Sequence, residues 1–193
     1  MDTIAKAIHI LKNGGIAIFP TDTAFGIGCR IDDEAAIKRL FKIRKRAETK
    51  AVPTLVSDLH MAQEYLQPVP SEVIEKLIKP YWPGALTIVL QCQTEKIPAF
   101  VRGGRDTLGV RVPNHLTTLG LINGVGVPII GTSANFSGEK TPYSFEDLDP
   151  ELTKLVDIVV PGEVKNRQES TVIDCTKEPW KVLRQGAVEV RTN

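Results

Sequence analysis

Short apolar runs recur along this chain and alternate with segments of helical periodicity. The clearest runs are residues 16–19, which are too short and too apolar to be anything but a buried strand, and residues 86–90, which are typical of a strand. Ile4, Ala7 and Leu11 recur at helical spacing before the first run, and asparagine and two glycines then end the helix. This interleaving, with several short links from strand to strand, predicts an α/β domain with a twisted mixed (parallel and antiparallel) sheet flanked by helices.

The same patterns give the position of each expected element. We expect helices at residues 4–11, 32–41, 58–65, 71–78, 115–122 and 148–156. We expect strands at residues 16–19, 53–56, 86–90, 108–112, 128–130, 157–160, 171–174 and 181–184. A chain of 193 residues is long enough to bury a sizeable core, and its length favours a single domain over residues 1–193.

Composition excludes several classes of protein. The hydrophobic share of 42% and the charged share of 24% are typical of a globular protein and not of a disordered or fibrous one. No apolar stretch approaches the roughly 18 residues that span a bilayer, and no signal peptide opens the chain, so we expect a cytoplasmic protein with no membrane partner. The three cysteines and three histidines are scattered, which predicts no disulfide framework and no protein-built metal site.

A polar turn follows the apolar run at residues 127–130. The small polar side chains of this turn are Thr132, Ser133, Asn135 and Ser137. Hydroxyl, amide and glycine residues at the end of a buried strand are typical of a ligand site in an α/β protein. No G-x-S-x-G elbow is present, so we expect these hydroxyl groups to position a ligand and not to act as nucleophiles.

A second polar segment leaves the strand at residues 16–19 through a proline. Thr21, Asp22 and Thr23 follow that proline and precede two glycines. These groups can hold a small polar ligand by hydrogen bonds. They can equally satisfy their own backbone in a turn, and the segment alone leaves both interpretations open.

Positive charge is concentrated in one segment of a chain whose net charge is only +1. Seven basic residues face a single acidic residue, Glu48: Lys38, Arg39, Lys42, Arg44, Lys45, Arg46 and Lys50. Arg46 and Lys50 lie beyond the helical pattern, on a loop that can bend toward a phosphate. No G-x-x-x-x-G-K-[ST] motif occurs, so a Walker-type nucleotide site is not expected, and a solvated helix face is the alternative for the whole segment.

Three further polar residues lie on or next to expected strands. Arg111 lies between two valines of a strand, where its side chain points to the face opposite theirs. Its partner is either a ligand carboxylate or one of the chain's own acids. Ser170 and Arg184 lie at strand ends and are weak signals singly.

Taken together, these segments resemble the YrdC-like family of L-threonylcarbamoyladenylate synthases. The matching segments, in order, are 14–15, 19–23, 44–50, 82–87, 110–113, 132–138, 169–174 and 183–184. They extend over nearly the whole chain, from about residue 14 to residue 187. No single motif is decisive, but this many motifs in the family's order are specific.

The resemblance implies an activity, its ligands and a set of site residues. The implied reaction makes threonylcarbamoyl-AMP and pyrophosphate from L-threonine, bicarbonate or CO2, and ATP, for the modification of tRNA next to the anticodon. Mg²⁺ would accompany ATP, and a threonylcarbamoyl-transferase partner of the TsaD type would use the product. Threonine would be bound by Thr21, Arg111 and Thr132, and the nucleotide by Arg44, Arg46, Lys50, Ser133, Asn135, Ser137, Ser170 and Arg184, with Arg46 and Lys50 catalytic. The resemblance also implies a single YrdC-like domain without the additional C-terminal domain of the family's larger members.

Two alternatives stay open. The first is a non-catalytic protein of the same fold that uses the basic segment to contact tRNA or double-stranded RNA. The second is a carbamoyl-transferring relative with a different acceptor, because Phe25 stands where the family usually has a tyrosine.

Overall fold

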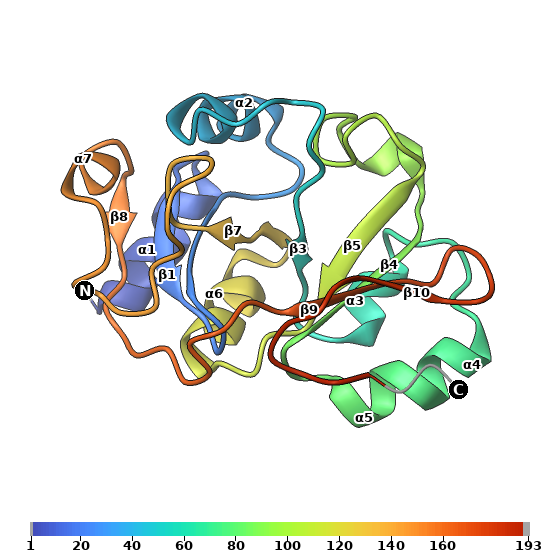
Figure 1. Ribbon diagram of the computed structural model, residues 1–193. Coiled ribbons are helices and arrows are strands. Elements are labelled where there is room, and N and C mark those ends of the chain that lie inside the picture. The colour runs from blue at the N-terminus through green and yellow to red at the C-terminus, as the bar shows by residue number, and fades with distance from the viewer. Residues whose placement is uncertain (1, 191–193) are drawn as a thin grey trace.

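The computed structural model describes residues 2–190, which form helices on both sides of strands that belong to two sheets (Figure 1). The helices are α1 (Thr3–Lys12), α2 (Glu34–Ile43), α3 (Leu59–Gln63), α4 (Ser71–Val73), η1 (Ile74–Ile78), α5 (Lys79–Tyr81), η2 (Thr94–Lys96), α6 (Leu116–Val125) and α7 (Pro150–Thr153). The strands are β1 (Ala17–Pro20), β2 (Phe25–Gly28), β3 (Thr54–Leu55), β4 (Leu86–Gln91), β5 (Thr107–Arg111), β6 (Ile129–Ile130), β7 (Thr132–Ser133), β8 (Ile158–Val159), β9 (Thr171–Asp174) and β10 (Lys181–Arg184).

The predicted fold class is confirmed, and the number of sheets differs from the prediction. A four-stranded sheet has the order β7-β2-β1-β8, and a six-stranded sheet has the order β10-β9-β4-β5-β3-β6. Both sheets are mixed: β1 pairs antiparallel with β2 and parallel with β8, while β4 pairs antiparallel with β5 and parallel with β9. Strands β2 and β7 were not predicted, and together they complete the smaller sheet.

The chain passes from one sheet to the other at Gly131. Just before it, β6 pairs with β3 in the larger sheet, and just after it β7 pairs with β2 in the smaller one. A Cβ atom at Gly131 would lie 2.4 Å from side-chain atoms of Leu55, so a glycine is needed where the backbone passes β3. Gly28 is constrained in the same way, since a Cβ there would lie 1.7 Å from the carbonyl oxygen of Ile130. The two sheets therefore approach each other closely at Gly28, Leu55, Ile130 and Gly131.

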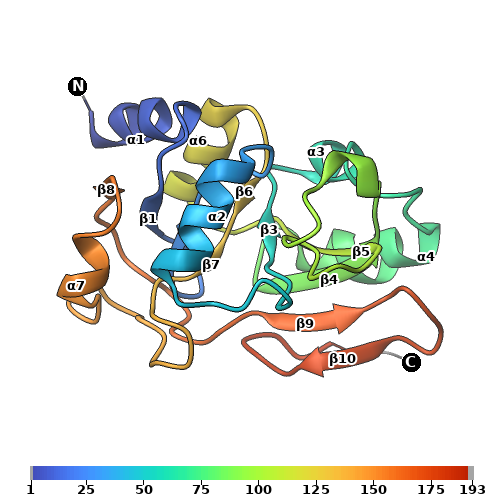
Figure 2. The same ribbon diagram turned by 90° about the horizontal axis from the view of Figure 1, so that it is seen from above.

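Helices cover the sheets where the apolar spacing predicts. Asp33 caps α2, its carboxylate accepting a hydrogen bond of 2.9 Å from the Ala36 amide, and α2 buries Ile37, Leu40 and Phe41. On the smaller sheet, α1 and α6 lie side by side in both views (Figures 1 and 2). The β9–β10 hairpin lies at the opposite side of the molecule from α1 (Figure 2). Within residues 2–190, every helix is too short or too polar to cross a membrane.

The cysteines behave as buried apolar residues. Cys29, Cys92 and Cys175 are all buried and unpaired, as the sequence predicts. Burial raises the pKa of the Cys175 thiol to about 12 and also raises the pKa values of the other two thiols. Each thiol is therefore overwhelmingly protonated at pH 8, and the protonated form is a poor nucleophile.

We expect the folded protein to resist thiol alkylation. At pH 8, iodoacetamide should modify fewer than one cysteine per chain in an hour, because burial blocks access and suppresses the thiolate. Unfolding in guanidinium chloride should expose all three thiols. Intact-mass spectrometry counts the adducts, and rapid labelling of Cys29 or Cys175 in the folded protein would contradict their burial.

Candidate functional site

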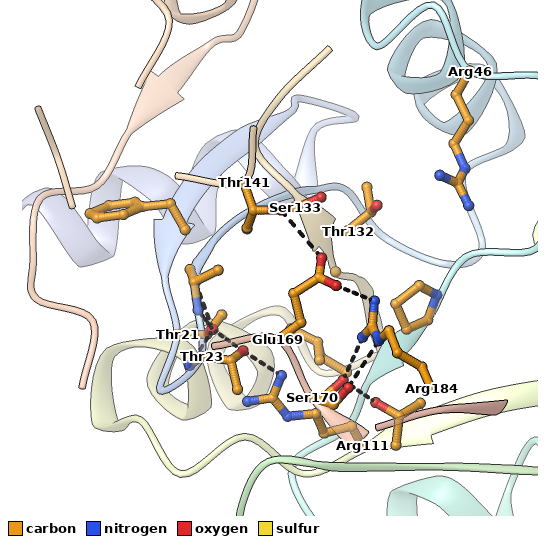
Figure 3. Close-up of a pocket in the computed structure, with 17 residues that line it drawn as sticks. Thr21, Thr23, Arg46, Arg111, Thr132, Ser133, Thr141, Glu169, Ser170 and Arg184 are labelled. Carbon is orange, nitrogen blue, oxygen red and sulfur yellow. Dashed lines mark hydrogen bonds and ion pairs between the residues drawn. The ribbon is translucent and has the colours of Figure 1, made fainter. Parts of the chain in front are cut away.

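A cavity of about 220 Å³ lies where the two sheets meet (Figure 3). Both sheets contribute to its wall: Gly26 and Ser133 come from the smaller sheet, and Leu55, Thr87 and Arg111 from the larger one. Its size suits part of a small ligand. The charged residues of the wall are Arg46, Arg111, Glu169 and Arg184.

Seven of the eleven predicted site residues line this cavity. They are Thr21, Arg46, Arg111, Thr132, Ser133, Ser170 and Arg184. Arg44, Lys50, Asn135 and Ser137 are outside the lining. Segments as far apart as 21 and 184 thus meet around one space, and the roles of individual residues stay predictions.

The Thr21–Thr23 segment forms a tight turn and also faces the cavity. The Thr21 hydroxyl donates to the Ala24 carbonyl at 2.7 Å and accepts hydrogen bonds from the amides of Thr23 and Ala24, each at 3.2 Å. The turn satisfies its own backbone, as one of the two interpretations held. Its proton is committed to Ala24 and its two lone pairs accept from the two amides, so the Thr21 hydroxyl has no hydrogen-bonding capacity left and a contact of Thr21 with a ligand is one of packing.

Arg111 is buried and held from three directions. Its guanidinium donates to the Gly84 carbonyl at 2.9 Å, to the Thr23 hydroxyl at 2.8 Å and to Asp22 Oδ1. One of the two predicted partners, an acid of the chain itself, is therefore present. Burial lowers the pKa of Arg111, and the nearby Asp22 carboxylate opposes that change. A guanidinium has five N–H donors, and three are used here, so two remain for a ligand.

Arg44 is buried without a carboxylate partner among residues 2–190. Its guanidinium donates to Thr132 Oγ1 at 2.6 Å, to Asn135 Oδ1 at 2.8 Å and to the Asn135 carbonyl at 2.9 Å. Burial lowers the pKa of Arg44 to about 10, and repulsion from Arg46 adds to this effect. The Ser137 amide donates to the Arg44 carbonyl at 2.8 Å. Through these hydrogen bonds Arg44 holds the polar turn at residues 132–137 in place.

Arg46 reaches the cavity from the loop that follows α2 (Figure 3). Its guanidinium donates to the backbone carbonyls of Ala51, at 2.8 Å, and Lys50, at 3.4 Å. No carboxylate within the described part of the chain forms an ion pair with it. Burial lowers the pKa of Arg46, and the group keeps donors for an anion. The Lys50 side chain is exposed.

Sequence reasoning missed three residues of the cavity wall, Glu169, Thr141 and Thr87. Glu169 Oε2 accepts from Arg184 at 2.8 Å, and Oε1 accepts from the Thr141 hydroxyl at 3.2 Å. The Ser170 hydroxyl lies 2.9 Å from that of Thr87 and accepts from Arg184 at 3.1 Å. Figure 3 shows the Glu169 side chain projecting between the Thr21 turn and Arg184. Its position directly before Ser170 was the available signal, but Thr141 comes from a segment without a motif.

Both the sequence and the fold match proteins that are already known. The family model Sua5_yciO_yrdC, with the description "Telomere recombination", matches residues 9–186. The chain is 32% identical over 189 residues to the threonylcarbamoyl-AMP synthase of Bacillus subtilis (strain 168), covering 96% of this chain and 54% of that protein. The chain thus spans about half the length of that curated relative.

Two solved structures share the fold. The crystal structure of P. abyssi Sua5 complexed with L-threonine matches with a TM-score of 0.87 and 34% identity, covering 95% of this chain and 54% of that chain. The crystal structure of E. coli YciO matches with a TM-score of 0.87 and 28% identity, covering 98% of this chain and 91% of that chain. The curated name of the E. coli protein is "Uncharacterized protein YciO".

Proposed function

The chain belongs to the Sua5/YciO/YrdC family, and from this premise we propose that it is a threonylcarbamoyl-AMP synthase. It would use L-threonine, bicarbonate or CO2, and ATP, and release pyrophosphate. One observation carries the proposal: three guanidinium groups and a set of hydroxyl groups surround a single small cavity between the sheets. The P. abyssi relative, solved with L-threonine, supports the choice of amino acid.

The reaction forms two bonds in sequence. The unprotonated amine of threonine attacks the carbon of CO2 and gives a carbamate with loss of a proton. A carbamate oxygen then attacks the α-phosphorus of ATP, and the bond from that phosphorus to pyrophosphate breaks. Carbamate and triphosphate are both anions, so their approach requires positive charge fixed in place.

The lining residues divide between the two substrates. We assign the threonine to Thr21, Arg111 and Thr132, where the two free donors of Arg111 suit a carboxylate. We assign the phosphates to Arg46 and Arg184 and the rest of the nucleotide to Ser133 and Ser170. Arg44 and Asn135 act indirectly. Arg44 donates hydrogen bonds to Thr132 and Ser133 and so holds both in place, and Asn135 accepts a further bond from the same guanidinium. Lys50 and Ser137 stay candidates for contact with the outer part of the nucleotide.

Mg²⁺ would accompany ATP in this reaction. No group of three His, Cys, Asp or Glu side chains within residues 2–190 is arranged to hold a metal ion. The phosphates of ATP would therefore supply most of its ligands, which suits an ion that keeps several waters and binds few protein groups. Its chemical contribution would be to neutralise charge on the phosphates.

The product would pass to tRNA in the cytoplasm. We propose that a threonylcarbamoyl-transferase of the TsaD type receives it, and that exposed basic residues near the cavity, including Lys45 and Lys50, contact the RNA. The main alternative keeps that RNA contact and omits the chemistry.

Pyrophosphate release from ATP tests the proposal. We expect release that requires both L-threonine and bicarbonate, with serine and alanine giving much slower reactions. Release that is indifferent to threonine would refute the assignment. Salt-sensitive binding of tRNA without adenylate formation would favour the RNA-binding alternative, and release driven by another acceptor would favour a different carbamoyl chemistry.

A further inference from the structure

Glu169 is the one carboxylate among the described residues that line the cavity. Its side chain is 37% exposed, so it is accessible to a ligand. One carboxylate oxygen accepts from Arg184 at 2.8 Å, and the other accepts from the Thr141 hydroxyl at 3.2 Å. The carboxylate is thus held over the cavity by two side chains from different segments (Figure 3).

An amino acid carries a negative carboxylate and a positive ammonium group, and the cavity wall offers only one residue of opposite charge to the ammonium group. Arg46, Arg111 and Arg184 suit a carboxylate and phosphates, and the threonine and serine hydroxyl groups are neutral. Asp22, the other acid close to this region, is 2% exposed and is paired with Arg111. Glu169 is therefore the group that can meet an ammonium ion with opposite charge.

Arg184 gives Glu169 a cation partner that a nucleotide would remove. A phosphate carries more negative charge than a carboxylate and accepts a forked pair of hydrogen bonds from arginine. When a phosphate takes Arg184, Glu169 keeps its bond from Thr141 and loses its ion pair. An ammonium ion arriving in the cavity would restore that pair.

We propose that Glu169 binds the ammonium group of the amino-acid substrate on entry, exchanging Arg184 for it when nucleotide phosphates occupy Arg184. The bound ammonium group then loses one proton to solvent and becomes the amine that attacks CO2. The inference rests on the function proposed above and adds a specificity residue to it. Glu169 then selects amino acids over hydroxy acids of the same shape. Threonine binds more tightly in the presence of nucleotide than in its absence, because only then is the carboxylate free of Arg184.

The test measures binding by calorimetry, with a non-hydrolysable ATP analogue at saturation. Glu169→Gln keeps the size of the side chain and removes its charge. We expect this variant to bind L-threonine ~10- to 100-fold more weakly than wild type, the effect of losing a charge-assisted hydrogen bond. Its affinity for the ATP analogue alone should stay equal to that of wild type or rise. Glu163→Gln is the matched control, since Glu163 is exposed, lies on the same segment and is outside the cavity lining.

A second ligand tests the inference on the wild-type protein itself. In 2,3-dihydroxybutanoate a hydroxyl group replaces the ammonium group of threonine, so wild type should bind it ~10-fold or more weakly than threonine. In Glu169→Gln this preference should shrink to within about threefold.

Each contrary outcome has a distinct meaning. Equal affinity of wild type for the two ligands, or unchanged threonine binding in Glu169→Gln, overturns the inference while the proposed function stands. Weakened nucleotide binding with unchanged threonine binding also overturns it, and shows that Glu169 only orients Arg184. A wild-type protein that binds nucleotide but no threonine overturns the proposed function, and this inference with it.

Discussion

Replacing Arg46 with alanine should lower the rate of threonine-dependent pyrophosphate release about 100- to 1,000-fold. The guanidinium reaches the cavity wall, and no acid in residues 2–190 neutralises it. It can therefore stabilise the negative charge that gathers as carbamate approaches the triphosphate. Folding should change little, because the side chain gives up only hydrogen bonds to the carbonyls of Lys50 and Ala51, a loss of about 1 kcal/mol.

A matched control separates this effect from a general loss of positive charge. Lys42→Ala removes an exposed cation from α2, in the same basic segment and outside the cavity lining, and should keep the wild-type rate. Arg46→Lys keeps the charge without the forked donors and should fall between the two. Initial rates at saturating ATP and threonine provide the measurement. A rate for Arg46→Ala within a few-fold of wild type would show that the charge needed for the reaction comes from elsewhere.

Replacing Asp22 with asparagine should lower the free energy of unfolding by about 3–5 kcal/mol. Asp22 and Arg111 are 2% and 5% exposed, and the substitution leaves the guanidinium buried beside a neutral amide. A charge stranded in this way is far more unfavourable than the loss of one hydrogen bond. In a domain of this size we expect the melting temperature to fall by roughly 10 °C.

The corresponding surface pair supplies the control. Asp32 forms a comparable ion pair with Arg30 at 2.7 Å, but its side chain is 40% exposed. Asp32→Asn should therefore lower stability by less than about 1 kcal/mol. Urea unfolding followed by circular dichroism gives both values. A loss in Asp22→Asn no larger than in Asp32→Asn would mean that Arg111 is stabilised without its carboxylate partner.

Local sequence patterns predicted the helices and strands whose stabilising residues lie within the element itself or next to it. Helix α2 combines a cap at Asp33 with buried residues at helical spacing, so a ten-residue window contains its whole explanation. Strand β2 reads Phe-Gly-Ile-Gly, and its glycines hide the alternation of a strand. The glycine at position 28 is explained only by the close approach of the Ile130 carbonyl, across about a hundred residues of sequence.

The candidate site shows the same limit. Motifs predicted seven of the residues that line the cavity, and all of these except Arg46 lie at or next to a strand end. The pairing within the set was not predictable: Arg44 lies 91 residues from Asn135, and Thr141 lies 28 residues from Glu169. The sequence does not show which residue a given side chain will contact. Only the folded structure therefore decides whether that side chain supports the site or faces the cavity.

The passage of the chain through Gly131 also links binding to stability. Residues 129–133 hydrogen-bond to the larger sheet at one end and to the smaller sheet at the other, so neither sheet can open there without disturbing the other. We therefore expect the two sheets to unfold as one cooperative unit rather than as separate halves. A ligand bound against Thr132 and Ser133 should then raise the free energy of opening of that unit and slow hydrogen exchange in strands that the ligand does not touch.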